Sequence, residues 1–266
     1  MKKITLIILV ASALMLAAML AVSELAAYFN HDRPLARPPE HGTAFIIEAG
    51  SPPNPGDTNA LTNLKTVMGQ RFRKFGLRVF GESLSGSRLR VVIPVMGTNE
   101  VEAARRLASH NGALELRLVH ENNDQLVAAG DVPPGYELLK HQEKRPPSGI
   151  YIETLVVEKR PATGLAGDIV KEAQITQDDL GRTEIAFELN QESSAAFAKF
   201  TRSNVNRRLA IILDGELYSS PNIASPIENG MVMITGDFDR QEASLLTTLM
   251  RYPLPLPVTL VEAKAF

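Results

Sequence analysis

The stretch LAIILDGELYS, residues 209–219, decides how the second half of this chain folds. Leu209–Leu213 is an unbroken apolar run of the length typical of a buried strand. Asp214-Gly215 follows it, and such a pair between two strand-like runs is a strong signal for a two-residue hairpin turn. The stretch therefore predicts a strand over Leu209–Leu213, a tight turn, and a returning strand over Glu216–Ser219.

The segments on both sides of this hairpin alternate between helix and strand patterns. One helix is predicted from the apolar spacing of Ala196, Phe197, Phe200 and Val205, and another from Leu245, Leu246 and Leu249 behind the capping residues Asp239 and Glu242. Strands are predicted at Tyr151–Glu158, Ile185–Leu189, Met231–Thr235 and Val258–Glu262. Single strands and single helices mixed with hairpins indicate α+β layers.

The first half of the chain shows the order β-α-β-β-α-β. Strands are predicted at Thr43–Ala49, Leu77–Glu82, Leu89–Val95 and Leu114–Leu118. A first helix carries Leu61, Leu64, Met68, Phe72 and Phe75, and a second is opened by a capping box of Asn99 and Glu102. This order is that of a ferredoxin-like unit. The basic residues Lys65, Arg71, Arg73 and Lys74 of the first helix are interpreted as a solvated face.

The amino-terminal segment indicates the compartment. Lys2 and Lys3 precede an uncharged, largely apolar run from Ile4 to Val22. A helix of about nineteen residues spans about 28 Å, close to the thickness of a bilayer core. The run is either a retained anchor or a signal peptide, for which Ala21-Val22-Ser23 would serve as the cleavage site. Both predict a folded part on the periplasmic, outer side of the cytoplasmic membrane.

Taken together, these patterns divide the chain into five parts. Residues 1–27 are the signal peptide or anchor helix, and residues 28–41 are a polar, proline-bearing tether. Residues 42–120 are the ferredoxin-like unit, 121–149 a polar linker, and 150–266 a second α+β unit.

Composition argues against several classes of function. The sequence has no Cys, so disulfides, thiolate metal sites and a cysteine nucleophile are excluded. The formal net charge of −2 disfavours nucleic-acid binding. The five His residues show no metal-ligand spacing, and Ser220 lacks the motifs of a serine nucleophile. We therefore expect no metal, no cofactor, no catalytic residues and no enzyme activity.

Several motifs together resemble the SecD family of protein-export membrane subunits. HGTAFIIEAG, beginning at His41, is similar to the strand that opens the first periplasmic domain in that family, and NGALELRLVHE, beginning at Asn111, to a later strand. The most specific part is FAKFTRSNVNRRLAIILDGELYSSPNIASPI, residues 197–227. ITGDFDRQEASLL and LPLPVTLVE follow in the family's order, so that the likeness covers residues 42–262.

The resemblance implies a base subdomain, a head subdomain, and a role in protein translocation. The implied partners are unfolded secretory polypeptide and the membrane subunits of the Sec translocase. In the family, further membrane helices that carry proton flow begin where this sequence ends, at Phe266. We therefore expect no proton-driven pulling by this chain alone.

Two functions stay open at this point. The first is a single-pass export accessory that contacts unfolded polypeptide, with an exposed strand edge accepting an extended chain. Its predicted contact segment comprises Leu217, Tyr218, Ser220, Asn222 and Ile223, with Tyr218 and Asn222 pointing outward; the alternative is that this segment is an ordinary strand of the sheet. The second function is a structural or assembly protein of the cell envelope that retains the fold without an export role.

Overall fold

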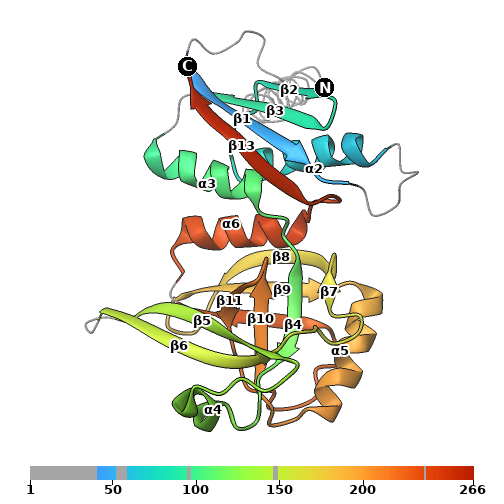
Figure 1. The fold of residues 1–266 in the computed structure, drawn as a ribbon, viewed down its shortest axis with the longest axis vertical. Coiled ribbons are helices and arrows are strands. Elements are labelled where there is room, and N and C mark those ends of the chain that lie inside the picture. Colours follow the sequence, from blue (N-terminus) through green and yellow to red (C-terminus); the bar gives the residue numbers. More distant parts are fainter. Residues whose placement is uncertain (1–40, 52–58, 95–96, 146–148, 237) are drawn as a thin grey trace, which may run out of the picture.

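The computed structural model describes residues 41–51, 59–94, 97–145, 149–236 and 238–266. Within these ranges the chain forms two stacked units, with helix α6 (Arg240–Arg251) between them (Figure 1). No helix in the described ranges is both long and apolar enough to cross a bilayer. The predicted span Ile4–Val22 and residues 28–40 of the predicted tether lie outside these ranges.

The first unit is a four-stranded antiparallel sheet in the order β13-β1-β3-β2. Its strands are β1 (Gly42–Ala49), β2 (Gly81–Ser85), β3 (Arg88–Pro94) and β13 (Val258–Ala265). Strand β13, from the carboxyl end, pairs with β1 from Thr43 opposite Ala265 to Ala49 opposite Val258. The first unit is therefore completed by a strand that follows the whole of the second unit.

The prediction that Leu114–Leu118 closes this first sheet is wrong. That segment is strand β4 (Leu114–Leu118), and it pairs with the second unit, Leu116 lying opposite Ile211. The chain leaves the first unit at Gly112, whose φ is +80°. The carboxylate of Asp214 accepts hydrogen bonds from the backbone N–H groups of Gly112 and Ala113, both at 2.9 Å, and so directs the chain into the second unit.

Two helices pack on the first sheet as their apolar spacing predicts. In α2 (Ala60–Lys74), Leu64, Met68 and Phe72 are completely buried, and the Phe72 ring lies 6.1 Å from that of Phe45 in β1. In α3 (Thr98–Ser109), the predicted Asn99–Glu102 capping box does not form, and a single hydrogen bond two residues earlier takes its place. The Glu100 carboxylate accepts from the Gly97 N–H at 2.9 Å, because the helix already begins at Thr98.

The second unit is built around a sheet in the order β11-β10-β4-β7. The predicted hairpin is confirmed: β10 (Leu209–Leu213) turns through Asp214 and Gly215, with φ values of 52° and 82°, into β11 (Glu216–Ser219). Every residue of β10 is buried. The remaining strand is the short β7 (Ala166–Gly167).

A second sheet in the order β12-β9-β8 lies in the same unit. It consists of β8 (Val170–Gln177), β9 (Thr183–Leu189) and β12 (Met231–Thr235). Helix α5 (Gln191–Ser203) covers the core with Phe197 and Phe200, whose rings stack 6.5 Å apart. Val205, predicted to be on this helix, lies just beyond its end.

The predicted polar linker, residues 121–149, contains regular structure. It forms α4 (Asn123–Ala129) and β5 (Tyr136–Arg145), and β5 pairs with β6 (Gly149–Glu158) in a long hairpin. The strand β5 was not predicted because its polar residues do not show the apolar pattern of a buried strand; some of them form ion pairs instead. Arg117 of β4, only 8% exposed, bonds to Glu115 and to Glu137 of β5. The hairpin is thereby joined to the central sheet by charged groups.

Candidate functional site

The segment predicted to contact a polypeptide is largely buried. Leu217 is 2% exposed, Ile223 3% and Tyr218 6%, so the prediction that Tyr218 points outward is wrong. The reason is a polar partner inside the molecule. The Tyr218 hydroxyl donates to the Glu216 carboxylate at 2.9 Å and accepts from the Arg106 guanidinium of α3 at 3.0 Å. Burial, and secondarily the charge of Glu216, raises the pKa of Tyr218 well above its usual value.

The outer edge of β11 is also occupied rather than open. Leu217 O accepts a hydrogen bond from Nδ1 of His141 in β5 at 2.8 Å, which places the ring proton on that nitrogen. Beyond the strand, Arg208 and Asn222 form an isolated bridge. The β5–β6 hairpin therefore takes the side of β11 on which an added strand would lie.

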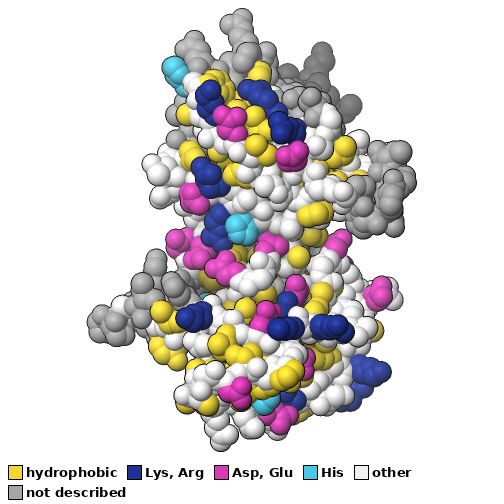
Figure 2. Space-filling model, in the orientation of Figure 1, with side chains coloured by type: hydrophobic (Ala, Val, Ile, Leu, Met, Phe, Trp, Pro, Cys, Tyr) yellow, Lys and Arg dark blue, Asp and Glu magenta, His cyan; other side chains and the backbone are white. Residues whose placement is uncertain are grey.

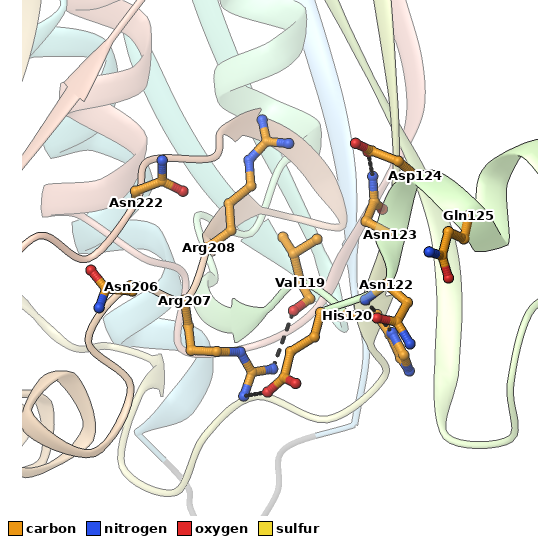
Figure 3. Close-up of a pocket in the computed structure, with 11 residues that line it drawn as sticks. Val119, His120, Asn122, Asn123, Asp124, Gln125, Asn206, Arg207, Arg208 and Asn222 are labelled. Atoms are coloured by element: carbon orange, nitrogen blue, oxygen red, sulfur yellow. Dashed lines mark hydrogen bonds and ion pairs between the residues drawn. The ribbon is translucent and has the colours of Figure 1, made fainter.

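The two polar residues of the predicted segment have different environments. The Ser220 hydroxyl donates to the Glu153 carboxylate at 3.0 Å, and Arg208 donates to both groups, so Ser220 belongs to an internal ion-pair network. Asn222 is exposed and lies on the rim of a hollow in the surface (Figure 3). Asn222 thus lies at a concave surface of the described part of the chain.

This hollow, here called the amide hollow, has a volume of about 600 Å³ and lies where β4 ends, α4 begins and β10 begins (Figure 3). Its wall is polar and rich in Asn. The lining residues are Val119, His120, Glu121, Asn122, Asn123, Asp124, Gln125, Asn206, Arg207, Arg208 and Asn222.

The two arginines of the amide hollow are ion-paired, Arg208 with Glu153 of β6, whereas the Asp124 carboxylate accepts a hydrogen bond from the Asn123 side chain at 3.0 Å. Arg207 forms an ion pair with Glu121 at 2.8 Å and also donates to the carbonyl oxygen of Val119 (Figure 3). Nδ1 of His120 accepts from the Asn122 N–H at 3.0 Å, which makes that nitrogen unprotonated. The exposed side-chain amides of Asn122, Gln125, Asn206 and Asn222 are left to face solvent.

The exposed amides of the hollow suit neutral hydrogen bonding. An Asn or Gln amide offers two donors and an acceptor with two lone pairs, which complements a peptide group. In the described ranges, no group of three or more His, Asp or Glu residues is placed to hold a metal ion. The hollow can therefore hold uncharged polar groups such as a polypeptide backbone.

A second polar cluster, around Arg71, joins the two units. Arg71 was predicted to lie on a solvated face of α2, but it is completely buried. Its guanidinium donates to four backbone carbonyls: Tyr252 at 2.6 Å, Leu107 at 3.1 Å, His110 at 2.5 Å and Asn111 at 2.6 Å. We call this arrangement the Arg71 clasp. It holds both stretches of chain that cross between the units, residues 110–113 and 252–257.

Burial lowers the pKa of Arg71 to about 9, and the negative charge of Asp214 opposes this shift. At neutral pH the group therefore keeps its charge. Sequence reasoning missed the clasp because Arg71 stands among the cations Lys65, Arg73 and Lys74. Lys74 is exposed, and Lys65 and Arg73 are half-buried. The available signal was its spacing: Arg71 adjoins Phe72 on the same helical stripe as Leu64 and Met68.

Apolar side chains are exposed at several places on the second unit. Figure 2 shows hydrophobic side chains on the visible surface of the second unit. On the β5–β6 hairpin the exposed ones include Leu138, 44% exposed, and Ile152, 52% exposed. On the sheet β12-β9-β8 they include Met231, 40% exposed, and Met233, 51% exposed. These patches add apolar contact surface to the polar surface of the amide hollow.

Comparison with known proteins shows which proteins this chain is similar to. Residues 138–256 match the family model described as the SecDF P1 head subdomain. The chain carries a SecD-type first periplasmic domain. The match covers the hairpin β10–β11, the whole of the sheet β12-β9-β8, the β5–β6 hairpin from Leu138 onward, and helices α5 and α6.

Curated relatives agree with this assignment. The chain is 33% identical over 179 residues to the protein translocase subunit SecD of Aquifex aeolicus. This alignment covers 66% of this chain and 34% of the relative. It is 31% identical over 202 residues to SecD of Desulfurispirillum indicum, covering 75% of this chain and 39% of the relative. The chain thus spans between a third and two fifths of the length of these SecD relatives.

Solved structures support the SecD-type fold. A crystal structure of SecDF in a super-membrane-facing form gives a TM-score of 0.61 at 23% identity, covering 95% of this chain and 35% of that one. A structure of SecDF described as a membrane component that enhances protein export gives a TM-score of 0.59 at 24% identity. That match covers 84% of this chain and all of that one. At these identities the likeness concerns the fold.

Proposed function

We propose that this chain is a non-enzymatic accessory of protein export that contacts unfolded secretory polypeptide at the outer face of the cytoplasmic membrane. The observation that carries the proposal is the SecDF P1 head match over residues 138–256, together with relatives named as protein translocase subunits. Under the same proposal, the run Ile4–Val22 is a single-pass anchor, and the Sec translocase membrane subunits are the neighbours of the domain.

Contact with unfolded polypeptide is supported by the chemistry of the amide hollow. A chain in transit exposes peptide N–H and C=O groups whatever its sequence, and a site serving many substrates gains from recognising these groups. The four solvent-facing amides offer such hydrogen bonds, while the arginines of the hollow are neutralised by Glu121 and Glu153. Of the predicted contact residues, we retain Asn222 as a direct contact, and we assign Leu217, Tyr218 and Ile223 to its structural support.

The experiment uses one probe in two states. A dye-labelled secretory protein is kept unfolded by reduction and alkylation of its cysteines, and the same protein with native disulfides serves as the folded control. A photo-crosslinking amino acid replaces Asn222 in the full chain, and in a second variant it replaces Lys199, which is exposed on α5. We expect crosslinks from position 222 to the unfolded probe, and few from position 199 or to the folded probe.

Two outcomes contradict the proposal. If the chain binds the folded and unfolded probes equally, recognition of unfolded polypeptide is wrong. If the chain binds neither but retains a specific folded partner in pull-downs from membranes, it acts as an assembly protein of the envelope.

A further inference from the structure

We propose that the outer edge of strand β12 binds an extended segment of unfolded polypeptide by strand addition, an inference that rests on the proposed function and names a second contact site for it. Strand β12 lies at one end of the sheet β12-β9-β8 and pairs with β9 alone in the part of the chain that the structure describes. The other edge of this sheet is different: β8 lies beside α6, and Glu172 of β8 is ion-paired with Arg251 of α6.

The hydrogen-bond register shows which backbone groups of β12 are free. Leu189 N–H donates to the Gly230 carbonyl at 3.0 Å, and the register continues with Val232 opposite Phe187 and Ile234 opposite Ile185. In an antiparallel ladder every second residue exchanges hydrogen bonds with its partner, and the residues between direct theirs to the other side. The backbone groups of Met231, Met233 and Thr235 therefore point away from β9.

One of these outward groups is already used. The Met231 N–H donates to the side-chain oxygen of Asn229 at 3.1 Å, as expected for a group on the side away from β9. Within the described ranges, the outward N–H and C=O groups of Met233 and Thr235 have no hydrogen-bond partner. They offer the alternating donors and acceptors that an incoming strand requires.

The side chains along β12 are those of a contact surface rather than of a protected edge. Sheet edges are commonly protected by Lys, Pro or a bulge, and Met231–Thr235 has none of these. The exposed side chains are Met231, Met233 and Thr235, whereas Val232 and Ile234 are buried in the core. Met is flexible and polarisable, and it adapts to apolar partners of different shape.

The length of the edge favours a passing polypeptide over a second copy of this chain. Five residues of strand span about 17 Å. A stable interface between folded proteins needs about 20–30 residues from each partner. An edge of this length therefore suits a weak, reversible contact with a strand supplied by an unfolded chain, and the uncharged side chains of β12 set no charge requirement on that strand.

The test measures binding of the unfolded, reduced and alkylated probe to the full chain by fluorescence anisotropy. Met233→Lys places a charge beside the incoming strand, and Met233→Pro removes an outward N–H without breaking the ladder to β9. Leu180→Lys is the matched control, because Leu180 is 78% exposed in the turn between β8 and β9 and the same charge is introduced there. We expect Met233→Lys and Met233→Pro to weaken binding about five- to tenfold. Leu180→Lys should leave binding within about twofold.

Hydrogen exchange of individual amides supplies a second readout that does not depend on a variant. Addition of the unfolded probe should slow exchange at Met233 and Thr235, whose N–H groups point outward. Exchange at Val232 and Ile234 should change little, because their N–H groups are already bonded to β9.

Each alternative outcome overturns the inference in a distinguishable way. If the wild-type chain binds the unfolded probe and Met233→Lys binds it equally well, β12 is not the site while the proposed function stands. If Leu180→Lys weakens binding as much as Met233→Lys, the contact is general apolar adhesion. If Met233→Lys abolishes self-association in sedimentation and leaves probe binding unchanged, the occupant is a second copy of the chain. If the wild-type chain does not bind the probe, the proposed function and this inference fail together.

Discussion

Substitution of Arg71 by Met should be among the most damaging single changes in this chain. Met keeps the aliphatic part of the side chain but cannot donate to the four backbone carbonyls of the Arg71 clasp. Each hydrogen bond from a charged donor contributes about 1.5–3 kcal/mol, and the desolvation of the buried guanidinium offsets several kcal/mol of this gain. The net loss expected for Arg71→Met is about 3–5 kcal/mol. Four carbonyl oxygens lose their donor at about 1–3 kcal/mol each, and the desolvation cost of the guanidinium, which Met does not carry, is subtracted from that sum.

Urea unfolding followed by far-ultraviolet circular dichroism measures this loss. With a urea m-value of about 3 kcal/mol/M, a loss of about 3–5 kcal/mol moves the midpoint by about 1–1.7 M. Arg71→Lys should give a smaller shift, because an ammonium group has three donors and lacks the planar fork that reaches both crossing segments. Lys74→Met, at an exposed position on the same helix, is the control and should shift the midpoint by less than about 0.2 M.

A small effect of Arg71→Met would contradict the role assigned to the Arg71 clasp. If Arg71→Met moves the midpoint by less than about 0.3 M, the four carbonyls must be satisfied in another way, and the clasp does not hold the two units together. An effect of Lys74→Met as large as that of Arg71→Met would show that the result reflects the charge of the helix rather than the buried contacts.

Three further predictions concern the joint between the units and the helix ends. Gly112→Ala should lower the free energy of unfolding by more than about 2 kcal/mol in the same urea assay, because φ is +80° and the added Cβ would lie 2.3 Å from the Leu249 carbonyl oxygen. Gly135→Ala is the control. There φ is +89° and no atom lies close to the added Cβ, so the loss should be about 1 kcal/mol. Tyr218 has a raised pKa in the folded state, so above pH 10 the unfolded chain loses this proton first and stability falls by up to about 1.4 kcal/mol per pH unit. Tyr218→Phe should lack this decline. The lowered pKa of Arg71 raises stability with pH, but Arg71 is present in both proteins, so its contribution cancels in the comparison. Parallel profiles of stability against pH would contradict the raised pKa of Tyr218. Asp239→Ala should cost about 1 kcal/mol, since the Asp239 carboxylate accepts from the Glu242 N–H at 2.8 Å at the start of α6, and an unchanged thermal midpoint would argue against this cap.

Local elements could be predicted from the sequence where neighbouring residues supply the stabilising contacts. The hairpin at Asp214-Gly215 formed as predicted, because both residues accept the positive φ angles that the turn needs. The helix opened by Asp239 also formed as predicted, because its cap lies within three residues along the chain. The strand β5 was missed, because its polar residues are stabilised by Arg117 and by other residues distant in sequence.

The candidate site could be predicted only in part, for the same reason. The segment Leu217–Ile223 was selected by pattern, but Tyr218 turned inward to Arg106, a residue of another unit. Nothing within the segment indicates that His141 would occupy the edge of β11 or that Asn222 would face a hollow formed with Asn122 and Asn206. The free edge of β12 is likewise a property of sheet order and register, which depend on which strands meet.

By itself, the sequence determined the local elements, the α+β class and the resemblance to the SecD family, because periodicity, turn residues and motifs act over a few residues. Only the tertiary structure decided where the strands go. Leu114–Leu118 joined the sheet of the second unit, and Val258–Ala265 returned to complete the first. The physical reason is that strand pairing is specified by partners far away in the chain, and here the buried charge of Arg71 and the carboxylate of Asp214 hold the two crossing segments in place.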